Sequence, residues 1–273
     1  MIPRTAKVRS YPVVERDQLI WIWMGEPDKA DEPLIVDASF HNDTANWPHK
    51  HHVYHIKAAA TMLADNLMDL THLPYVHADN VGGEVGQHID AQMDVTPTDR
   101  GARVLRWFPS CPPPPTYRAA VPGLPENVER WQEFEFFVPS VMLQWTGAVQ
   151  VGQGARDPGK RAGGFSLRMF HGMTPETETT CHYFWSAANG YRQDQSETTD
   201  QLFVEIAKAF SQDKQIIELQ QARISETGEE WMVPTCHDVA RVAMRRALER
   251  LEKTSGPVAA GPVPPRKASQ NAS

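Results

Sequence analysis

The feature that most constrains the fold is a long strand-rich segment between residues 87 and 188. β-branched and aromatic residues dominate it, and short breaks rich in Pro and Gly divide it into runs of strand length. The runs at 131–138 and 141–151 are close enough to pair as an antiparallel hairpin, and so are those at 165–173 and 179–188. The segment therefore predicts an antiparallel sheet.

Helical patterns flank the strand-rich segment on both sides. The sequence predicts a helix over 60–73, which Pro74 should stop, and two long helices over 200–226 and 236–253. Helices segregated from an antiparallel sheet define an α+β fold. We expect a helix-grip (START/Bet v1-like) arrangement, in which the sheet packs on the long C-terminal helices and leaves a cavity for a ligand.

The two ends of the chain differ from this central part. Residues 11–15 and 19–24 are typical of two short strands joined by a polar turn, and residues 26–52 are irregular. Because a domain rarely opens on a bare hairpin, we expect the hairpin to follow a part of the protein that lies upstream. Residues 254–273, rich in Pro, Ala and Ser, are expected to be a disordered tail.

Charge and cysteine content narrow the class of ligand. The chain has 27 Lys and Arg against 34 Asp and Glu, a net charge of −7 with a pI near 5.9. Such a balance argues against nucleic acids and anionic membranes as partners. No stretch approaches the ~18 apolar residues of a membrane span, and Cys111, Cys181 and Cys236 form no CxxC pair. We expect a cytoplasmic protein with reduced thiols and a small-molecule substrate.

The densest polar cluster lies in the first predicted helix. Asn66, Asp69 and His72 are three residues apart, so on a helix they share one face beside an apolar stripe. Such groups are costly to bury unless they are paired or bind a metal. Pro74 breaks the helix before His77, which can then turn back beside His72. A surface helix end with two unrelated histidines is the alternative.

A carboxylate interrupts the apolar face of the long predicted helix. That face follows a three–four spacing through Phe203, Ile206, Phe210, Asp213, Ile217 and Gln220. A buried Asp213 needs a cation, a set of hydrogen bonds or a metal, and an ion pair from the sheet would suffice. Two histidines and a distant carboxylate are the ligand set of non-haem Fe(II) sites that leave positions open for oxygen. The same set can hold Zn²⁺ for hydrolysis.

Four further histidines lie close together: His49, His51, His52 and His55. Histidine-rich tracts can bind metals, but no adjacent Cys or carboxylate accompanies this one. A solvated loop is the favoured interpretation.

These motifs resemble those of a known family, the Rieske non-haem iron oxygenases. Residues 66–77, NLMDLTHLPYVH, resemble its mononuclear-iron motif, and residues 210–220, FSQDKQIIELQ, resemble its third-ligand helix. Residues 11–27 and 173–185 are similar to its monooxygenase branch, above all to oxygenase components of the vanillate O-demethylase and dicamba monooxygenase type. The resemblance covers roughly residues 2–253.

The resemblance implies a ligand set and a reaction. His72, His77 and Asp213 would bind mononuclear Fe(II), with Asn66 near the iron. Asp69 would lie behind His72, fix its tautomer and link it to the Rieske centre of a neighbouring subunit in a homotrimer. The iron would use O₂ and two external electrons to oxidise a substrate C–H bond. In the demethylase branch that bond belongs to an aryl methoxy group, and the product collapses to a phenol and formaldehyde.

The resemblance also implies substrate contacts on the sheet. Substrates of this branch are often aromatic acids such as vanillate, and His171 and Gln144 stand at matching positions, with Arg168 as a further partner for an anion. His171 and Arg168 are three residues apart on one strand, so without a bulge at most one of them faces a cavity. Trp185 could line an aromatic pocket, but a place in the core is favoured.

One part of the family pattern is absent from the sequence. Members carry an N-terminal Rieske domain with Cys and His ligands for a [2Fe–2S] cluster, whereas no Cys precedes Cys111 here. We therefore expect residues 1–25 to be strands that follow a missing Rieske domain, and residues 26–253 to be the catalytic domain. The cluster would come from a missing domain or a partner, and its electrons from NAD(P)H through a reductase or ferredoxin component.

Two other functions could use the same residues. A metal-dependent hydrolase would keep water in the open position, although Asp69 is engaged by the histidine and leaves no obvious general base. A non-catalytic module would hold an aromatic ligand in the cavity, which the missing cluster domain favours.

Overall fold

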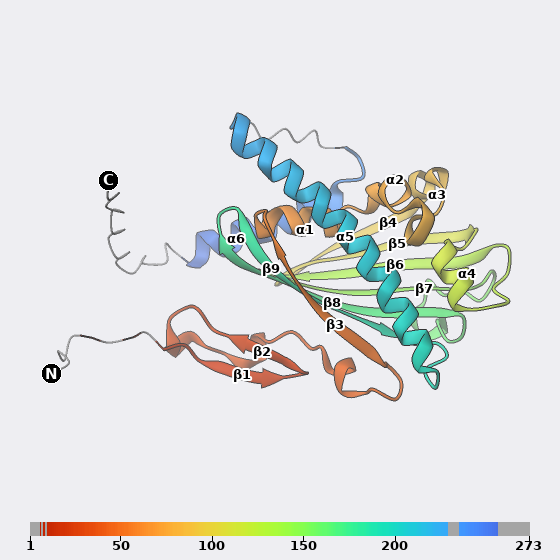
Figure 1. The fold of residues 1–273 in the computed structure, drawn as a ribbon, viewed down its shortest axis with the longest axis horizontal. Helices are drawn as coiled ribbons and strands as arrows, with labels where there is room; N and C mark the ends of the chain where they lie inside the picture. The colour runs from red at the N-terminus through yellow and green to blue at the C-terminus, as the bar shows by residue number, and fades with distance from the viewer. Residues whose placement is uncertain (1–5, 7, 9, 229–234, 256–273) are drawn as a thin grey trace, which may run out of the picture.

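The computed structural model describes residues 6, 8, 10–228 and 235–255. Its centre is a seven-stranded antiparallel sheet in the order β3-β9-β8-β7-β6-β5-β4 (Figure 1). The expected hairpins, β6–β7 and β8–β9, are confirmed. The strands are β3 His49–Ile56, β4 Gln92–Thr98, β5 Gly101–Cys111, β6 Val128–Phe137, β7 Val141–Gln150, β8 Phe165–Thr177 and β9 Thr180–Asn189.

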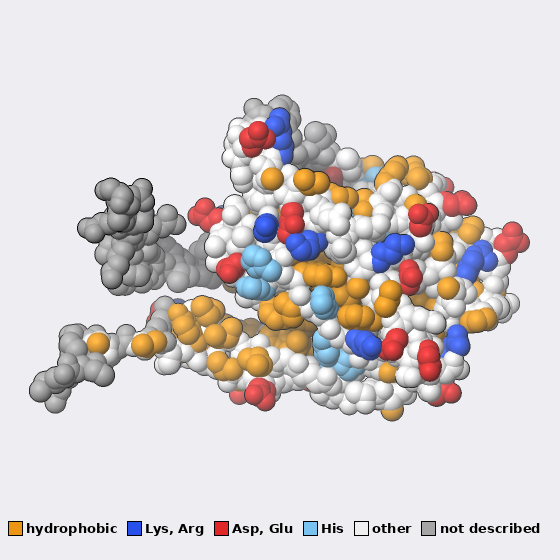
Figure 2. Space-filling view, viewed as in Figure 1, with side chains coloured by type: hydrophobic (Ala, Val, Ile, Leu, Met, Phe, Trp, Pro, Cys, Tyr) orange, Lys and Arg blue, Asp and Glu red, His pale blue; other side chains and the backbone are white. Residues whose placement is uncertain are grey.

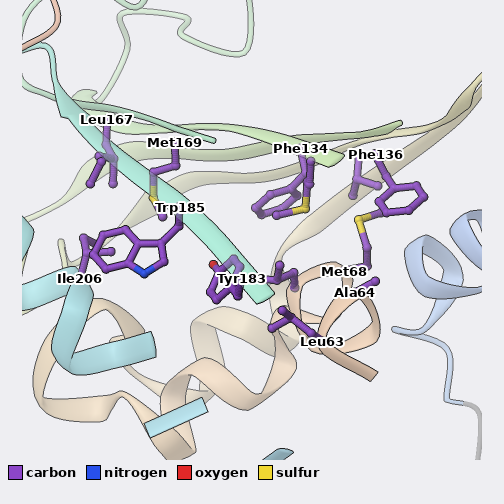
Figure 3. Close-up of a cluster of buried hydrophobic side chains, with 14 of the residues drawn as sticks. Leu63, Ala64, Met68, Phe134, Phe136, Leu167, Met169, Tyr183, Trp185 and Ile206 are labelled. Atoms are coloured by element: carbon purple, nitrogen blue, oxygen red, sulfur yellow. The ribbon is translucent and has the colours of Figure 1, made fainter. Parts of the chain in front are cut away.

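Strand residues alternate between the two sides of the sheet, and one of these sides packs against helices. On β8, Leu167 and Met169 point to the helix side, as Figure 3 shows. Leu63 and Met68 of α1 (Ala60–Met68) belong to the same cluster of buried side chains. This side is called the inner face below, and the opposite side the outer face.

Two long helices follow the sheet, as expected for an α+β helix-grip fold. α5 (Ser196–Thr227) runs diagonally across the inner face and packs on β3 and β9 (Figure 1). α6 (Val239–Ser255) packs along β5 and against α1. The buried face of α5 differs from the prediction at one position, because Gln220 is exposed and Gln221 is buried. Gln221 faces the connection from β3 to α1, and its Oε1 accepts a hydrogen bond from the backbone N–H of Ala59 in that connection.

The helix predicted over 60–73 is interrupted. α1 ends at Met68, and Asp69 has an extended backbone with φ −118° and ψ 103°. A 3-10 turn, η4 (Leu70–His72), follows. The single helical face expected for the three polar residues of this segment is therefore wrong.

The prediction that Pro74 ends a helix is wrong. Pro74 lies in the first turn of α2 (Leu73–Val76), where the backbone N–H that proline lacks would have no partner within the helix. The glycine-containing segment after α2 is also more regular than a loop. It forms a π-helical turn, η5 (Ala78–Gly82), and a short helix, α3 (Val85–Asp90).

The histidine-rich tract is a strand and not the expected loop. His49, His51, His52 and His55 belong to β3 and pair with β9 along their whole length. β3 is an edge strand of the sheet. An edge strand can carry polar, exposed side chains while its backbone stays paired on one side, so polarity alone did not distinguish it from a loop.

Shorter elements complete the described part of the chain, and within it no helix is both long and apolar enough to cross a membrane. Residues 256–273, nearly all of the expected disordered tail, lie outside the described residues. The short elements are β1 Val13–Arg16, β2 Leu19–Ile22, η1 Pro27–Lys29, η2 Glu32–Leu34, η3 Ser39–Asn42, α4 Pro115–Ala120 and η6 Pro158–Lys160.

The predicted N-terminal hairpin is confirmed as the antiparallel pair β1–β2. Its turn residues Asp17 and Gln18 have positive φ values of 57° and 61°, the conformation that suits the twist of a tight hairpin. The hairpin packs on the outer face, where Trp21 meets Phe170 edge-on with ring centroids 6.0 Å apart. Its other side stays exposed, and Figure 2 shows apolar side chains gathered over it.

Candidate metal centre

Three side chains from separate elements converge between α5 and the segment around α2. The Oδ1 atom of Asp213, on α5, lies 3.1 Å from Nε2 of His77 and 3.5 Å from Nε2 of His72. His72 closes η4, and His77 follows α2. All three side chains are largely buried, with His72 the most exposed at 21%. The structure therefore brings together the three residues predicted as ligands.

The break at Asp69 orients the ring of His72. Nδ1–H of His72 donates to the backbone carbonyl of Asp69 at 2.7 Å. The Asp69 carboxylate accepts instead from the backbone N–H of Thr71 at 2.9 Å, and so caps η4. Asp69 does lie behind His72, as predicted, but it acts through its carbonyl and not through its carboxylate.

Gln212, which the sequence analysis missed, orients the ring of His77. Nδ1–H of His77 donates to Oε1 of Gln212 at 2.8 Å. Gln212 directly precedes Asp213 on α5. This position next to a predicted ligand is the one feature of the sequence that could have indicated its role. Because carbonyl oxygens only accept hydrogen bonds, both Nδ1 atoms carry protons, and Nε2 of each ring faces Asp213.

At the centre, the charge of Asp213 opposes the effect of burial on both histidines. Burial lowers the pKa of His72, although the charge of Asp213 opposes this. Burial also disfavours a charged His77, but the hydrogen bond and the charge of Asp213 outweigh it and raise the pKa of His77. The carboxylate and the two Nε2 atoms are all acceptors when the rings are neutral, so only a proton or a metal ion can join them.

The surroundings fit a divalent metal ion. Nδ2 of Asn66 donates to Oδ1 of Asp213 at 3.3 Å, while Oδ1 of Asn66 is buried without a hydrogen-bond partner. An orphaned oxygen beside imidazole and carboxylate donors is a group that a metal ion would satisfy. The ligand atoms of His72, His77 and Asp213 lie within 4.8 Å of one another. This donor set suits Fe(II), and it suits Zn²⁺ as well.

A cavity adjoins the centre, between α5 and the inner face of the sheet. It contains about 650 Å³ of space between atoms, including the part that is open to solvent. Apolar side chains such as Leu67, Phe165 and Ile206 form much of the wall. Polar side chains of β6 and β7 complete it: Arg130, Gln132, Gln144 and Thr146.

His171 lies behind Gln144 and does not line the cavity. Its Nδ1 is 2.7 Å from the hydroxyl of Tyr183, and its Nε2 is 3.2 Å from Oε1 of Gln144. Complete burial lowers the pKa of His171 to about 3, so the ring is neutral. The tyrosine O–H therefore donates to Nδ1, and Nε2–H donates to Gln144. Of these two predicted substrate contacts, only Gln144 reaches the cavity.

Arg168 and Trp185 are not brought to the cavity. Arg168 lies on the outer face, with its guanidinium carbon 4.4 Å from the ring centroid of Trp47. The register between β7 and β8 has no bulge that would turn it inward, which corrects its predicted place. Trp185 is on the inner face but only 1% exposed, and it stacks on Phe203 at 5.0 Å in the core, the role that the sequence favoured.

A second group of possible ligands lies on the sheet, formed by His55, Glu176 and His182. Glu176 accepts hydrogen bonds from Nε2 of His55 at 2.7 Å and from the hydroxyl of Thr180 at 2.8 Å. These side chains are nearly half exposed. The Glu176 carboxylate has hydrogen-bond partners and is accessible to solvent. Unlike the buried centre, this group therefore shows no unsatisfied oxygen that a metal ion would satisfy.

Fold and site together define a class of protein: a helix-grip domain with two histidines and a carboxylate beside an internal cavity. Residues 56–254 match the family described as the vanillate O-demethylase oxygenase C-terminal domain. The chain belongs to this family of Rieske-type oxygenase components, as the resemblance predicted.

Individual relatives agree with this membership. The toluene-4-sulfonate monooxygenase system iron-sulfur subunit of Comamonas testosteroni is 31% identical over 253 residues, which cover 92% of this chain and 72% of that protein. The vanillate O-demethylase oxygenase subunit of Pseudomonas sp. strain HR199 is 33% identical over 251 residues, with 89% and 69% covered. A crystal structure of dicamba monooxygenase bound to 3,6-dichlorosalicylic acid matches with a TM-score of 0.82 and 30% identity, over 92% of this chain and 72% of that one. The match confirms the predicted fold class.

Proposed function

We propose that this chain is the catalytic domain of an oxygenase that uses mononuclear Fe(II) and O₂ to oxidise a small aromatic substrate. The reaction proposed is O-demethylation of a methoxylated aromatic acid such as vanillate. One observation carries the proposal: two Nε2 atoms and a carboxylate oxygen converge beside a cavity, while both Nδ1 atoms donate to fixed acceptors. The relatives named for vanillate and toluene-4-sulfonate support a small aromatic substrate.

In this proposal His72, His77 and Asp213 would hold the iron beside the cavity. The bound iron supplies the activation of O₂ for oxidation of a substrate C–H bond. Asp69 and Gln212 keep the ligand nitrogens turned inward, because they accept the Nδ1 protons of the two histidines. Asn66 holds the Asp213 carboxylate through its amide N–H.

The cavity wall suits an aromatic ring. Phe165, Leu167 and Ile206 offer apolar contacts, and Gln144 and Thr146 offer hydrogen bonds at fixed positions on β7. Oxidation of a methoxy carbon held beside the metal centre would release formaldehyde and leave a phenol.

The oxidation needs two external electrons. We propose that they come from NAD(P)H through a reductase or ferredoxin component and a Rieske [2Fe–2S] centre that this sequence does not supply. Its three cysteines, Cys111, Cys181 and Cys236, lie on separate segments, and two of them are buried. A cytoplasmic homotrimer that brings a neighbouring centre to Asp69 belongs to the same proposal.

Anaerobic loading with Fe(II), followed by metal analysis, tests the proposal. We expect about one iron per wild-type chain and loss of that iron in His72→Ala. His55→Ala removes a histidine of the exposed group and serves as the matched control that keeps iron. Iron retained by His72→Ala would contradict the ligand set. Preference for Zn²⁺ with oxygen-independent ester hydrolysis would favour the hydrolase, and ligand binding without any metal would favour the binding module.

A further inference from the structure

We propose that Arg130 recognises the acid group of the aromatic substrate, a carboxylate or a sulfonate, by its charge. The inference rests on the proposed function, because it assigns to the same cavity the residue that recognises the acid group of the substrate. It gives to a residue of β6 the role that the sequence suggested for Arg168, which the structure places on the outer face.

Arg130 is a buried cation without a counter-charge. It is 0% exposed and lines the cavity. Throughout the described residues, no carboxylate comes within ion-pair distance of it; the neighbouring Glu129 and Glu133 are engaged by the 152–155 turn and by other arginines. Burying an unpaired guanidinium is costly. An anionic ligand in the cavity would supply the missing charge.

The surroundings hold the guanidinium still but do not saturate it. Nη2 donates to the carbonyl of Val81 at 3.1 Å, and Nη1 lies 3.4 Å from the carbonyl of Gly82. The rings of Phe108 and Tyr117 lie 5.1 and 5.2 Å from its central carbon. Nε is buried and has no hydrogen-bond partner. The guanidinium is therefore fixed in orientation, and its Nε–H remains available as a donor. A preformed binding site for an anion has these two properties.

A second buried arginine strengthens the positive potential on this part of the inner face. Arg106, on β5, is 5% exposed and donates to Gln132 and to the carbonyl of Leu70. Burial, and then the charge of Arg130, lower the pKa of Arg106 to about 10. The two positive charges repel each other, and an anion beside Arg130 would reduce this repulsion.

Among the described residues that line the cavity, no group outside the metal centre other than Arg130 can recognise an anion by its charge. His171 is neutral and lies behind Gln144. His72 and His77 belong to the metal centre. Among the described residues that line the cavity, Arg130 is the one Lys or Arg side chain. Carboxylates and sulfonates present pairs of oxygens that match the fork of an arginine.

Ligand binding to the Fe(II)-loaded chain under anaerobic conditions tests the inference. The probes are 4-methoxybenzoate, 4-methoxybenzenesulfonate and the uncharged methyl 4-methoxybenzoate, and the measurement is isothermal titration calorimetry. We expect wild type to bind at least one of the two anions about tenfold or more tightly than the ester, the scale of a charge-assisted hydrogen bond. The two anions show whether the cavity prefers a carboxylate or a sulfonate.

Variants assign the preference to one residue. Arg130→Met should lose the preference for the anion over the ester. Arg130→Lys should retain part of it. Arg168→Met is the matched control on the outer face and should retain all of it.

The outcomes separate this inference from the proposed function. Equal binding of acid and ester by wild type, or a preference that survives in Arg130→Met, overturns the role of Arg130 and leaves the oxygenase proposal standing. If Arg130→Met fails to fold, the anion-to-ester comparison in wild type and in Arg130→Lys still tests the role of Arg130. Binding of none of the three compounds contradicts the proposed aromatic substrate and this inference together.

Discussion

At the scale of single residues, the proposed metal centre depends on the hydrogen-bond acceptors behind its candidate ligands as much as on those ligands. Neutral imidazole binds a metal through only one nitrogen, so the proton on the other nitrogen must have an acceptor. Here the acceptors are the carbonyl of Asp69 and the side chain of Gln212. Asp69 lies three residues before His72, and Gln212 lies next to Asp213. Each short stretch of chain therefore carries a candidate ligand together with an acceptor that orients a histidine.

Replacing Gln212 should weaken the metal centre without removing a ligand. We expect Gln212→Leu to lower the affinity for Fe(II) by about 10–100-fold, because Nδ1–H of His77 loses its acceptor. Gln212→Glu keeps an acceptor and should restore most of the affinity. Gln215→Leu, at an exposed position of the same helix, is the control. Anaerobic metal titration measures all four proteins, and wild-type affinity in Gln212→Leu would show that the contact does not matter.

The three candidate ligands could be predicted from the sequence, whereas the acceptors that orient them and the role of Arg130 in the cavity wall could not. His72, His77 and Asp213 stand out because polar residues there interrupt apolar patterns. Arg130 also occupies an inward strand position, between Val128 and Phe134 along β6. Nothing local distinguishes it from a surface arginine, because its lack of a counter-charge depends on every neighbour that the fold brings close.

At the scale of elements, α5 does more than carry Asp213. Its last turns accept hydrogen bonds from the backbone between β3 and α1: Lys57 N–H donates to Glu218 at 2.9 Å, and Ala59 N–H donates to Gln221 at 3.0 Å. These bonds satisfy backbone groups that have no partner in β3 or α1. They also set where α1 begins, and therefore where its end delivers Asp69 and the histidines.

Gln221 should matter for stability where its neighbour Gln220 does not. We expect Gln221→Leu to lower the free energy of unfolding by about 1–3 kcal/mol, because the N–H of Ala59 is left without an acceptor. Gln220→Leu changes an exposed side chain and should stay within about 0.5 kcal/mol of wild type. Urea denaturation compares the two variants. Equal losses would mean that the hydrogen bond to Ala59 contributes nothing specific.

Element types were predicted where the pattern is local and strong. The β6–β7 and β8–β9 hairpins and the two long helices follow from runs of strand or helix period between clear breaks. The break at Asp69 was missed because residues 60–73 are helical by composition throughout. The carboxylate of Asp69 caps a new turn at Thr71, and this local alternative to a continuous helix does not show in the composition.

At the scale of the whole molecule, three buried histidines from different elements stay uncharged. Burial lowers the pKa of His41, in η3, to about 4, with the nearby His49 adding to the effect. Burial lowers the pKa of His88, in α3, and of His171, in β8, to about 3. The ordinary value is 6.5, so acid protonates these rings in the unfolded chain first. The stability they provide is complete above pH 6.5 and is lost as the pH falls from 6.5 toward about 4 for His41 and about 3 for His88 and His171.

His41 offers a direct test of this acid sensitivity. Its Nδ1–H donates to the carbonyl of Asp17 at 3.0 Å, and its Nε2 accepts from Ser186 at 2.7 Å. We expect His41→Gln to be less stable than wild type near neutral pH, and the difference to shrink as the pH falls toward 4. Chemical denaturation at several pH values measures it, with exposed His52→Gln as the control. A difference that is constant with pH would contradict the buried neutral ring.

The sequence by itself determined the α+β order, the two central hairpins, the long helices and the three residues that converge as candidate metal ligands. Periodicity, turn residues and costly polar groups are properties of short stretches, so they can be read without coordinates. Only the tertiary structure decided that the histidine tract is an edge strand, that Arg168 faces outward and that Gln221 is buried. Only it placed Arg130 beside the cavity without a counter-charge. These outcomes depend on which distant segments cover a side chain, and burial, pairing and charge balance are set by neighbours far away in the chain.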